Sequence, residues 1–151
     1  MMHLAMYQPD IPQNVGAAIR VAACFGAQLN IIGPCGFPLD NRRLKRVAMD
    51  YESLAPPTAY DSWDVFLTQR NKGRIVLLTT KARETVWDYK FQPDDILLLG
   101  RESEGAPAEV HEAADERIKI PMAEGARSLN IAVSAAVALA EARRQLGWSD
   151  T

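Results

Sequence analysis

Ile96-Leu97-Leu98-Leu99, at residues 96–99, is a run of four aliphatic side chains that follows an aspartate and stops at Gly100. A second run of the same kind, Ile75-Val76-Leu77-Leu78, lies upstream of it. Strands that are apolar without alternation have both faces covered, which is typical of parallel sheets flanked by helices. The two runs therefore predict buried strands of an α/β domain.

The rest of the chain continues this alternation of short strands and helices. Strands are predicted at residues 3–7, 28–32, 74–79, 95–99 and 116–120, and helices from Pro12 to Gly26, over 42–46, over 61–70 and from about Ser128 to Leu146. Asn14 is the expected N-cap of the first helix. The last helix is expected to bury one apolar stripe, formed by Leu129, Ala132, Val133, Ala136, Val137 and Ala140. The pattern predicts an α/β fold with a mostly parallel sheet and leaves the strand order open.

The composition indicates one globular domain over residues 1–151. Apolar residues make up 48% and charged residues 24%, which excludes a disordered chain.

No apolar run approaches the roughly 18 residues of a membrane span, and no leader pattern begins the sequence, so a cytoplasmic protein is expected. Cys24 and Cys35 form no CxxC pattern, and His3 and His111 lie apart, so two reduced thiols and no metal site are expected.

The charge balance is mildly acidic, with a net charge of −2 and a pI of about 5.7. An RNA-binding protein with this balance must concentrate its positive charge locally, because phosphate contacts require cations. Such a concentration occurs at Arg42, Arg43, Lys45 and Arg46. The alternative is an ordinary solvated helix face.

The common nucleotide-binding and hydrolase fingerprints are missing. Neither GxGxxG nor GxxxxGK[ST] occurs, and there is no GxSxG elbow. A Rossmann-type methyltransferase or dehydrogenase would be expected to carry the first of these. Any catalytic site must therefore use other segments.

The first of three such segments is Asn14-Val15-Gly16-Ala17-Ala18-Ile19-Arg20. Gly16 and Arg20 are one helical turn apart and share a face beside the apolar stripe. A glycine there removes side-chain bulk, and an arginine one turn later can reach a phosphate. The alternative is a surface arginine above a packing glycine.

The other two segments follow predicted strands. Residues 99–107 leave the carboxyl end of a buried strand, where open α/β sheets bind ligands, and Gly100 and Gly105 bracket four polar residues. Residues 120–130 precede the last helix, and Ser128 and Asn130 supply hydrogen-bonding groups near its N-terminus. The alternatives are a plain strand-to-helix turn and a capped helix start.

Together and in this order, the three segments resemble the three motifs of the SPOUT methyltransferases, in their SpoU branch. Within that branch the chain is similar to the small tRNA (cytidine/uridine-34) 2′-O-methyltransferases. The similar stretches are Tyr7-Gln8-Pro9-Asp10-Ile11-Pro12-Gln13-Asn14, Ile31-Ile32-Gly33-Pro34 with Gly36-Phe37, Asp50-Tyr51, Leu78-Thr79-Thr80-Lys81, Ile120-Pro121-Met122 and Arg127-Ser128-Leu129-Asn130. They span nearly the whole chain without large insertions.

The resemblance implies a trefoil-knotted α/β subunit, a homodimer with the site at its interface, and S-adenosyl-L-methionine as the methyl donor without a metal. It implies a tRNA anticodon stem-loop as the substrate, with neither DNA nor a membrane as a partner. The donor-binding positions would be Leu78, Thr79, Gly100, Glu102, Ile120, Met122, Ser128 and Leu129. Asn14, Arg20 and Asn130 would face the reacting ribose, and Arg42, Arg43, Lys45 and Arg46 would guide the RNA.

The resemblance also suggests a chemical role for Arg20. Because arginine is effectively always protonated, Arg20 is expected to clamp the adjacent phosphate and stabilise the developing alkoxide, rather than to act as the base. A phosphate oxygen or water would then accept the proton.

Three positions depart from the pattern of the relatives. Arg101 stands where many carry proline, Glu104 where a basic residue is common, and Ala132 where a hydroxyl residue is frequent. Glu104 removes positive charge near the expected ribose, so it bears on the RNA substrate more than on the donor site.

Three other functions stay open. They are the same reaction on another tRNA or rRNA nucleotide, a non-catalytic RNA-binding or assembly protein of the same fold, and a flavodoxin-like small-molecule binder. The second is disfavoured by retention of the motif residues Asn14, Arg20, Gly100, Glu102, Ser128 and Asn130.

Overall fold

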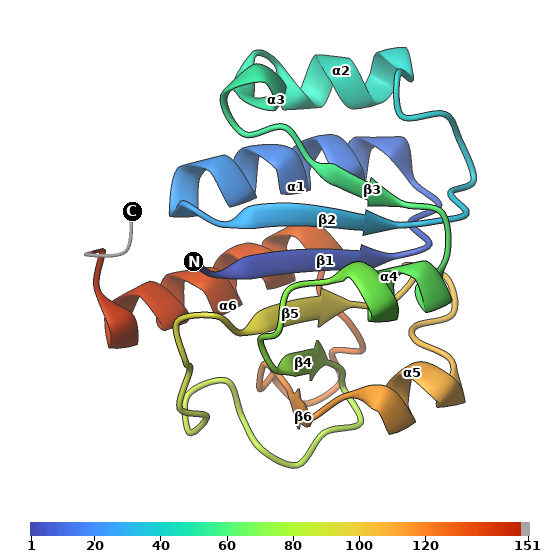
Figure 1. Ribbon diagram of the computed structural model, residues 1–151. Coiled ribbons are helices and arrows are strands. Elements are labelled where there is room, and N and C mark those ends of the chain that lie inside the picture. Colours follow the sequence, from blue (N-terminus) through green and yellow to red (C-terminus); the bar gives the residue numbers. More distant parts are fainter. Residues whose placement is uncertain (149–151) are drawn as a thin grey trace.

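The computed structural model describes residues 1–148, which form a six-stranded sheet with helices on both faces (Figure 1). The strands are β1 His3–Tyr7, β2 Gln28–Ile32, β3 Thr58–Tyr60, β4 Ile75–Leu78, β5 Ile96–Leu99 and β6 Glu116–Ile118. The helices are α1 Pro12–Phe25, α2 Arg42–Ala48, α3 Tyr51–Leu54, α4 Trp63–Gln69, α5 Ala108–Ala113 and α6 Ile131–Leu146. Residues 149–151 of the domain expected over 1–151 lie outside the described residues.

The sheet has the order β3-β2-β1-β5-β4-β6, and every pairing in it is parallel. The predicted α/β class with a mostly parallel sheet is confirmed. In register, Met6 pairs with Leu99, and Leu99 pairs with Leu78. The carboxyl ends of β1, β5 and β4 therefore meet at one edge, which is where sheets of this kind bind ligands.

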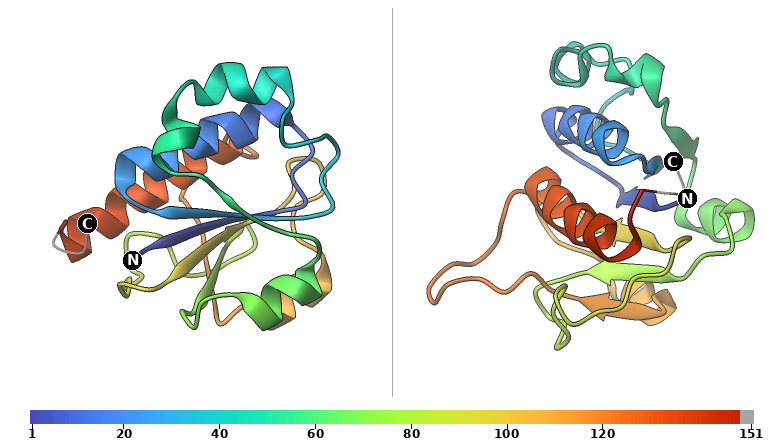
Figure 2. Two further views of the ribbon diagram at one scale, coloured as in Figure 1. Left: turned by 45° about the horizontal axis from the view of Figure 1, so that its top comes forward. Right: turned by 90° about the vertical axis from the view of Figure 1, so that its left-hand side faces the viewer.

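Both faces of the sheet are buried, as the unbroken apolar strands predict. In β5, Leu97 and Leu99 belong to the core cluster under α1 and α6, whereas Ile96 and Leu98 belong to the cluster under α4 and α5. Figure 2 shows these two helical layers on opposite sides of the sheet. Successive side chains point to opposite faces, so a strand with two covered faces must be apolar throughout.

The connection between β4 and β5, residues 79–95, is tied to two later parts of the chain. The backbone N–H of Lys119 donates to the carbonyl of Glu84 at 2.9 Å, and that of Val86 donates to the carbonyl of Lys119 at 2.8 Å. The side chain of Gln145, in α6, accepts from the N–H of Phe91 at 3.0 Å. The chain leaving β6 and the end of α6 are thus both fastened to one connection.

One predicted N-cap and one predicted helix start are wrong. Helix α1 begins at Pro12, with Ile11 as its N-cap, so Asn14 lies inside the first turn and does not cap it. Proline suits the first helical position because its φ is fixed and it lacks an N–H group. Helix α6 begins at Ile131 and is capped by Asn130, whose Oδ1 accepts from the N–H groups of Ala132 at 2.9 Å and Val133 at 3.2 Å. Ser128 consequently belongs to the preceding loop.

The predicted inward stripe of α6 is also wrong, apart from Ala132. Leu129 and Val133 are 40% and 47% exposed, and the buried face consists of Ala132, Ala135, Ala138, Leu139 and Ala142. Ala136 and Val137 are half-buried and Ala140 is exposed. An alanine-rich helix is apolar on most sides, so periodicity alone does not select the packed face. Packing on α1 selects the small residues, because they allow close approach.

The predicted basic helix is confirmed as α2, which lies against α1 at the β3 edge (Figure 1). The two helices approach closely at Gly16, where an added Cβ would lie 2.5 Å from the carbonyl oxygen of Leu44. Gly16 is therefore a packing glycine, which was the alternative explanation of the Gly16–Arg20 pair. The sequence did not predict β3, α3 or α5, each of which spans only a few residues.

Candidate active site

A cavity of about 520 Å³ opens at the carboxyl edge of the sheet, between the ends of β4 and β5 and the start of α6. All eight predicted donor positions line it, together with two of the three residues expected to face the ribose. These residues are Leu78, Thr79, Gly100, Glu102, Ile120, Met122, Ser128, Leu129, Asn14 and Asn130. Segments that are far apart in the sequence are thus brought to one place.

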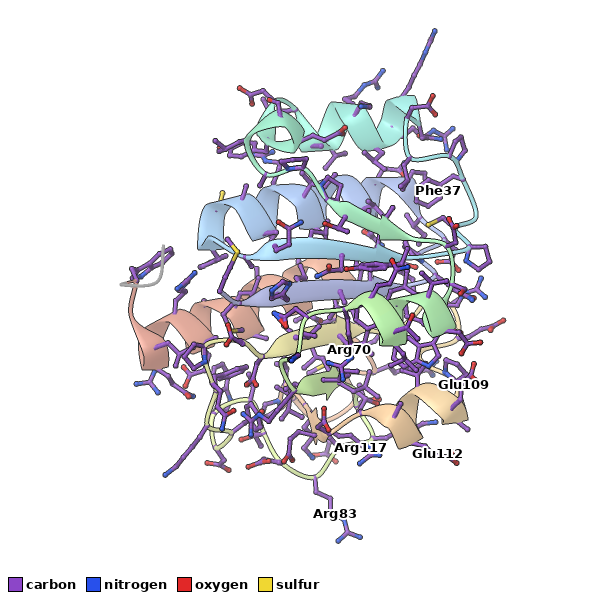
Figure 3. The ribbon with its side chains drawn as sticks, viewed as in Figure 1. Phe37, Arg70, Arg83, Glu109, Glu112 and Arg117 are labelled. Atoms are coloured by element: carbon purple, nitrogen blue, oxygen red, sulfur yellow. The ribbon has the colours of Figure 1, made fainter. Side chains whose placement is uncertain are left out.

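Several lining residues had no role assigned from the sequence. Lys81 extends the predicted Leu78–Thr79 stretch, and His111 comes from α5, which was not predicted. Ser134 lies one turn beyond the Asn130 cap. Burial lowers the pKa of the His111 imidazole, and the charge of Lys81 adds to the effect. By contrast Arg83, in the same 79–95 connection as Lys81, points out into solvent (Figure 3).

Residues 100–106 form a tight loop whose backbone lines the cavity. Arg101 and Gly105 exchange backbone hydrogen bonds of 3.2 and 2.8 Å, and Gly105 has a left-handed φ of 70°. At Gly100 a Cβ would lie 2.6 Å from the nitrogen of Ala106 and 2.7 Å from the carbonyl carbon of Gly105. Only glycine fits there without moving the loop.

A chain of hydrogen bonds links the three predicted segments. Because Asn130 uses Oδ1 to cap α6, its Nδ2 faces Asn14 and donates to Asn14 Oδ1 at 3.2 Å. Asn14 Nδ2 in turn donates to Glu102 Oε1 at 3.3 Å. The helix cap therefore fixes the orientation of both amides at the mouth of the cavity.

Glu102 also contacts Asp10, which follows β1 at the same edge of the sheet. The N–H of Asp10 donates to Glu102 Oε2 at 3.2 Å, and Ser103 Oγ donates to Asp10 Oδ2 at 2.7 Å. Burial raises the pKa of the Glu102 carboxyl, and contact with Asp10 raises it further. Hydrogen bonding with Glu102, and then with Ser103, lowers the pKa of Asp10. As the pH falls, Glu102 therefore takes up a proton before Asp10 does.

Two of the departures from the family pattern compensate each other. The Arg101 guanidinium lies 3.6 Å from an Asp10 carboxylate oxygen and 3.9 Å from one of Glu104. The positive charge missing at Glu104 is thus present three residues earlier, on another cavity-lining side chain. Ala132, the third departure, is buried in the first turn of α6, and its N–H serves the Asn130 cap.

The remaining predicted residues lie outside the cavity. Arg20 is exposed on α1, with its guanidinium over the ring of Tyr51. Arg42, Arg43, Lys45 and Arg46 are exposed on α2, where Lys45 forms a 2.8 Å salt bridge with Glu52. The structure therefore separates the predicted RNA-binding helix and Arg20 from the donor positions of the same chain.

Within residues 1–148, no group of three or more His, Cys, Asp or Glu side chains is arranged to hold a metal ion. No described helix is both long enough and apolar enough to cross a membrane.

Comparison with known families assigns the chain. The model of the SpoU rRNA Methylase family matches residues 1–140. The chain belongs to the SpoU rRNA methylase family. The family resemblance inferred from the three segments is thereby confirmed, and the cavity lined by these segments lies within the SpoU-matched region.

Individual SpoU relatives agree over nearly the full chain. A tRNA (cytidine(34)-2′-O)-methyltransferase from Beijerinckia indica is 49% identical over 95% of this chain and 91% of its own. A solved structure described as giving insights into the 2-OH methylation of C/U34 on tRNA is 40% identical, with a TM-score of 0.91, and covers 97% of this chain and 96% of its own. An AdoMet-bound rRNA methyltransferase from Sinorhizobium meliloti has a TM-score of 0.86 at 28% identity; the match covers 96% of this chain and 56% of that one.

Proposed function

We propose that this SpoU-family protein transfers a methyl group from S-adenosyl-L-methionine to the 2′-hydroxyl of nucleotide 34 of tRNA. The observation that carries the proposal is the cavity at the carboxyl edge, where Gly100, Glu102 and Ser128 meet Asn14 and Asn130. Relatives that match over more than nine tenths of their own length carry this activity in their names. The alternative acceptors are the ribose of another tRNA nucleotide and the ribose of an rRNA nucleotide, and both require the same cavity.

The cavity has features that suit the donor. Its volume of about 520 Å³ lies within the usual range for small-molecule sites. The loop at Gly100 brings bare backbone to the cavity wall, and Leu78, Ile120, Met122 and Leu129 add apolar surface. Glu102 and Ser128 supply polar groups. In the bound state the donor would provide a methyl group already activated by a sulfonium charge.

The residues of the chain would then orient the acceptor. Asn14 and Asn130 each keep amide groups at the cavity mouth, where they can hold the ribose with its 2′-oxygen about 3 Å from the methyl carbon. The new C–O bond forms as the C–S bond breaks, and the 2′-oxygen loses its proton. Arg20 clamps the neighbouring phosphate and stabilises the developing alkoxide, and a phosphate oxygen or water accepts the proton.

A homodimer is the second part of the proposal. Arg20 does not line the cavity of its own chain, so an Arg20 that acts on the ribose must come from a second copy. The surface next to the cavity suits such a copy, since Ile11, Leu129 and Val133 are 40%, 40% and 47% exposed and apolar. We infer that these residues pack against the partner.

A trefoil knot is the third part of the proposal. The 79–95 connection is hydrogen-bonded both to the chain that leaves β6 and to the end of α6. These contacts support a path in which the last part of the chain passes through that connection.

The proposed function is tested by incubating purified protein with S-adenosyl-L-methionine and unmodified tRNA. Mass spectrometry of the nucleosides and of mapped fragments is expected to show a 2′-O-methyl group at position 34. Methylation at another nucleotide would contradict the proposed acceptor, nucleotide 34, and would leave the proposed 2′-O-methyl transfer in place. Donor binding without methylation of any RNA would indicate a protein that has kept the cavity and lost the reaction.

The exposed basic helix α2 is expected to carry tRNA affinity. Arg42→Glu with Arg43→Glu removes two cations that form no salt bridge within residues 1–148, unlike Lys45. The apparent Kd for tRNA should rise about tenfold or more at moderate salt, and its salt dependence should flatten, because fewer counterions are released on binding.

Filter binding across a salt series measures the Kd for tRNA and its salt dependence. Calorimetry measures the affinity for the donor, which should stay unchanged. The matched control is Lys72→Glu, an exposed lysine that precedes β4 at the opposite edge of the sheet from the cavity. An equal loss of tRNA and donor affinity would contradict the assignment and indicate a folding defect.

A further inference from the structure

The Asp50-Tyr51 pair is one part of the sequence resemblance to which the proposed function gives no role. In the structure Tyr51 begins α3, and the Arg20 guanidinium lies over its ring, with the Cζ atom 5.3 Å from the ring centroid. Within residues 1–148, the Arg20 side chain forms no hydrogen bond or salt bridge. We propose that Tyr51 is a positioning residue for Arg20, and this rests on the proposed role of Arg20 in methyl transfer.

The packing of α1 and α2 accounts for the placement of the ring. Gly16 lets α2 approach α1 closely, and Arg20 lies one turn further along the same face of α1. After α2 the chain reverses at Met49, whose φ of 55° is unusual for a residue with a side chain. This turn returns the chain toward α1, so that Tyr51 packs on the core cluster beside Arg20.

The short helix that carries Tyr51 is itself held in place. Lys45 Nζ reaches Glu52 Oε1 at 2.8 Å, and Ser53 Oγ donates to the carbonyl of Asp50 at 2.8 Å. The Tyr51 side chain is half-buried, whereas Arg20 is exposed. The ring is therefore the fixed member of the pair, and the arginine is the member whose position is restricted.

A ring is a suitable holder for a catalytic arginine. A cation–π contact uses the face of the guanidinium and leaves the N–H groups, which lie in its plane, available to a phosphate. A carboxylate in the same place would occupy those N–H groups and neutralise the charge. The ring also restricts a side chain that would otherwise lose conformational freedom when the RNA binds.

The test compares Tyr51→Leu, which removes the ring, with Tyr51→Phe, which keeps it. For Tyr51→Leu we expect kcat for tRNA methylation to fall about tenfold, consistent with the size of a partly desolvated cation–π contact, while the donor Kd stays unchanged. Tyr51→Phe should restore kcat to near the wild-type value. Leu54→Ala, on the same short helix and 73% exposed, is the matched control and should behave as wild type.

Two further measurements separate positioning from simple packing. In an Arg20→Lys background the loss caused by Tyr51→Leu should shrink to about twofold or less, because a lysine cannot stack as a plane. The Arg20 Nε–Hε signal in NMR should be ordered in the wild type and in Tyr51→Phe, and mobile in Tyr51→Leu. The NMR result does not depend on activity, so it decides the contact even if the wild type transfers no methyl group and the proposed function fails.

Three results would overturn the proposal. The first is Tyr51→Phe as impaired as Tyr51→Leu, which would assign the effect to the hydroxyl group. The second is full additivity of Tyr51→Leu with Arg20→Lys. The third is an Arg20 signal that is equally mobile with and without the ring.

Discussion

The Arg20→Ala variant is expected to lose methyl transfer almost completely, with kcat at least about 10² to 10³ lower than in the wild type. The expected size is that of removing one preorganised donor to a developing oxyanion. Affinity for S-adenosyl-L-methionine should stay within about twofold of the wild type, because Arg20 lies outside the cavity. Single-turnover methylation of tRNA gives the rate, and calorimetry gives the donor Kd.

The matched control for Arg20 is Arg83→Ala. Arg83 is an exposed arginine that points into solvent from the 79–95 connection (Figure 3), and its loss should leave the rate unchanged. Near-normal turnover of Arg20→Ala would remove Arg20 from the mechanism. Loss of donor binding together with turnover would instead indicate an altered fold.

The second large effect is expected from Gly100→Ala, which should weaken donor binding about 10- to 100-fold. The added Cβ would lie 2.6 Å from the nitrogen of Ala106, so the 100–106 loop must move, and overpacking of this kind typically destabilises by about 1 to 3 kcal/mol. Because the backbone of this loop lines the cavity, the displacement acts directly on the donor site.

Calorimetry and thermal melts, with and without the donor, measure this loss. A folded variant whose Tm rises less than that of the wild type at the same donor concentration is the expected result, since stabilisation by a ligand falls as its Kd for the native state rises. Gly36→Ala is the matched control, because its Cβ would be 3.6 Å from the nearest atom, an ordinary contact. Unchanged donor affinity in Gly100→Ala would exclude this loop from the site.

The same two variants test whether Arg20 acts on the partner subunit. Mixed dimers of Arg20→Ala and Gly100→Ala chains contain one intact donor cavity and one intact Arg20, on different subunits. If Arg20 acts across the interface, random mixing should restore about a quarter of the wild-type activity, because half of the dimers are mixed and each has one complete site. If the mixture stays inactive, each cavity uses the Arg20 of its own chain.

The sheet could be predicted from the sequence because its signal is local. The run at residues 96–99 is apolar without alternation, and that pattern has one ready explanation in a sheet covered on both faces. The order of the strands depends on contacts between distant segments, and no short stretch of sequence contains it. The position of β5 between β1 and β4 is therefore a property that only the structure shows.

Helix α6 shows where pattern reasoning fails. Its apolar residues occur on nearly every side, so the choice between the Val133 and Ala135 faces depends on what packs against each. Leu129 and Val133, which the sequence placed in the core, are exposed, and the proposed dimer would cover them. A single chain thus buries one apolar face of α6 in its own core, and the sequence pattern does not identify which face this is.

The cavity-lining residues that the sequence predicts belong to recognisable motifs. The lining residues that it does not predict lie outside any motif. The loops at Gly100 and Ser128 carry recognisable spacing, whereas His111 and Ser134 reach the cavity only through the placement of α5 and α6. Asp10 could have been found, because it directly follows β1 at the edge where the other strands end. Arg20 was predicted to face the ribose, and its separation from the cavity of its own chain could not be predicted from the sequence.

The hydrogen bonds that fasten the 79–95 connection to Lys119 and Gln145 have a consequence for biosynthesis. A ribosome makes the connection well before the segments that it holds, and Ser128 and Asn130 emerge among the last parts of the domain. An unfinished chain can therefore form much of the sheet but lacks one wall of the cavity. The ability to take up the donor would arise only when the final segment has docked, which makes donor uptake by a nascent chain a direct readout of complete folding.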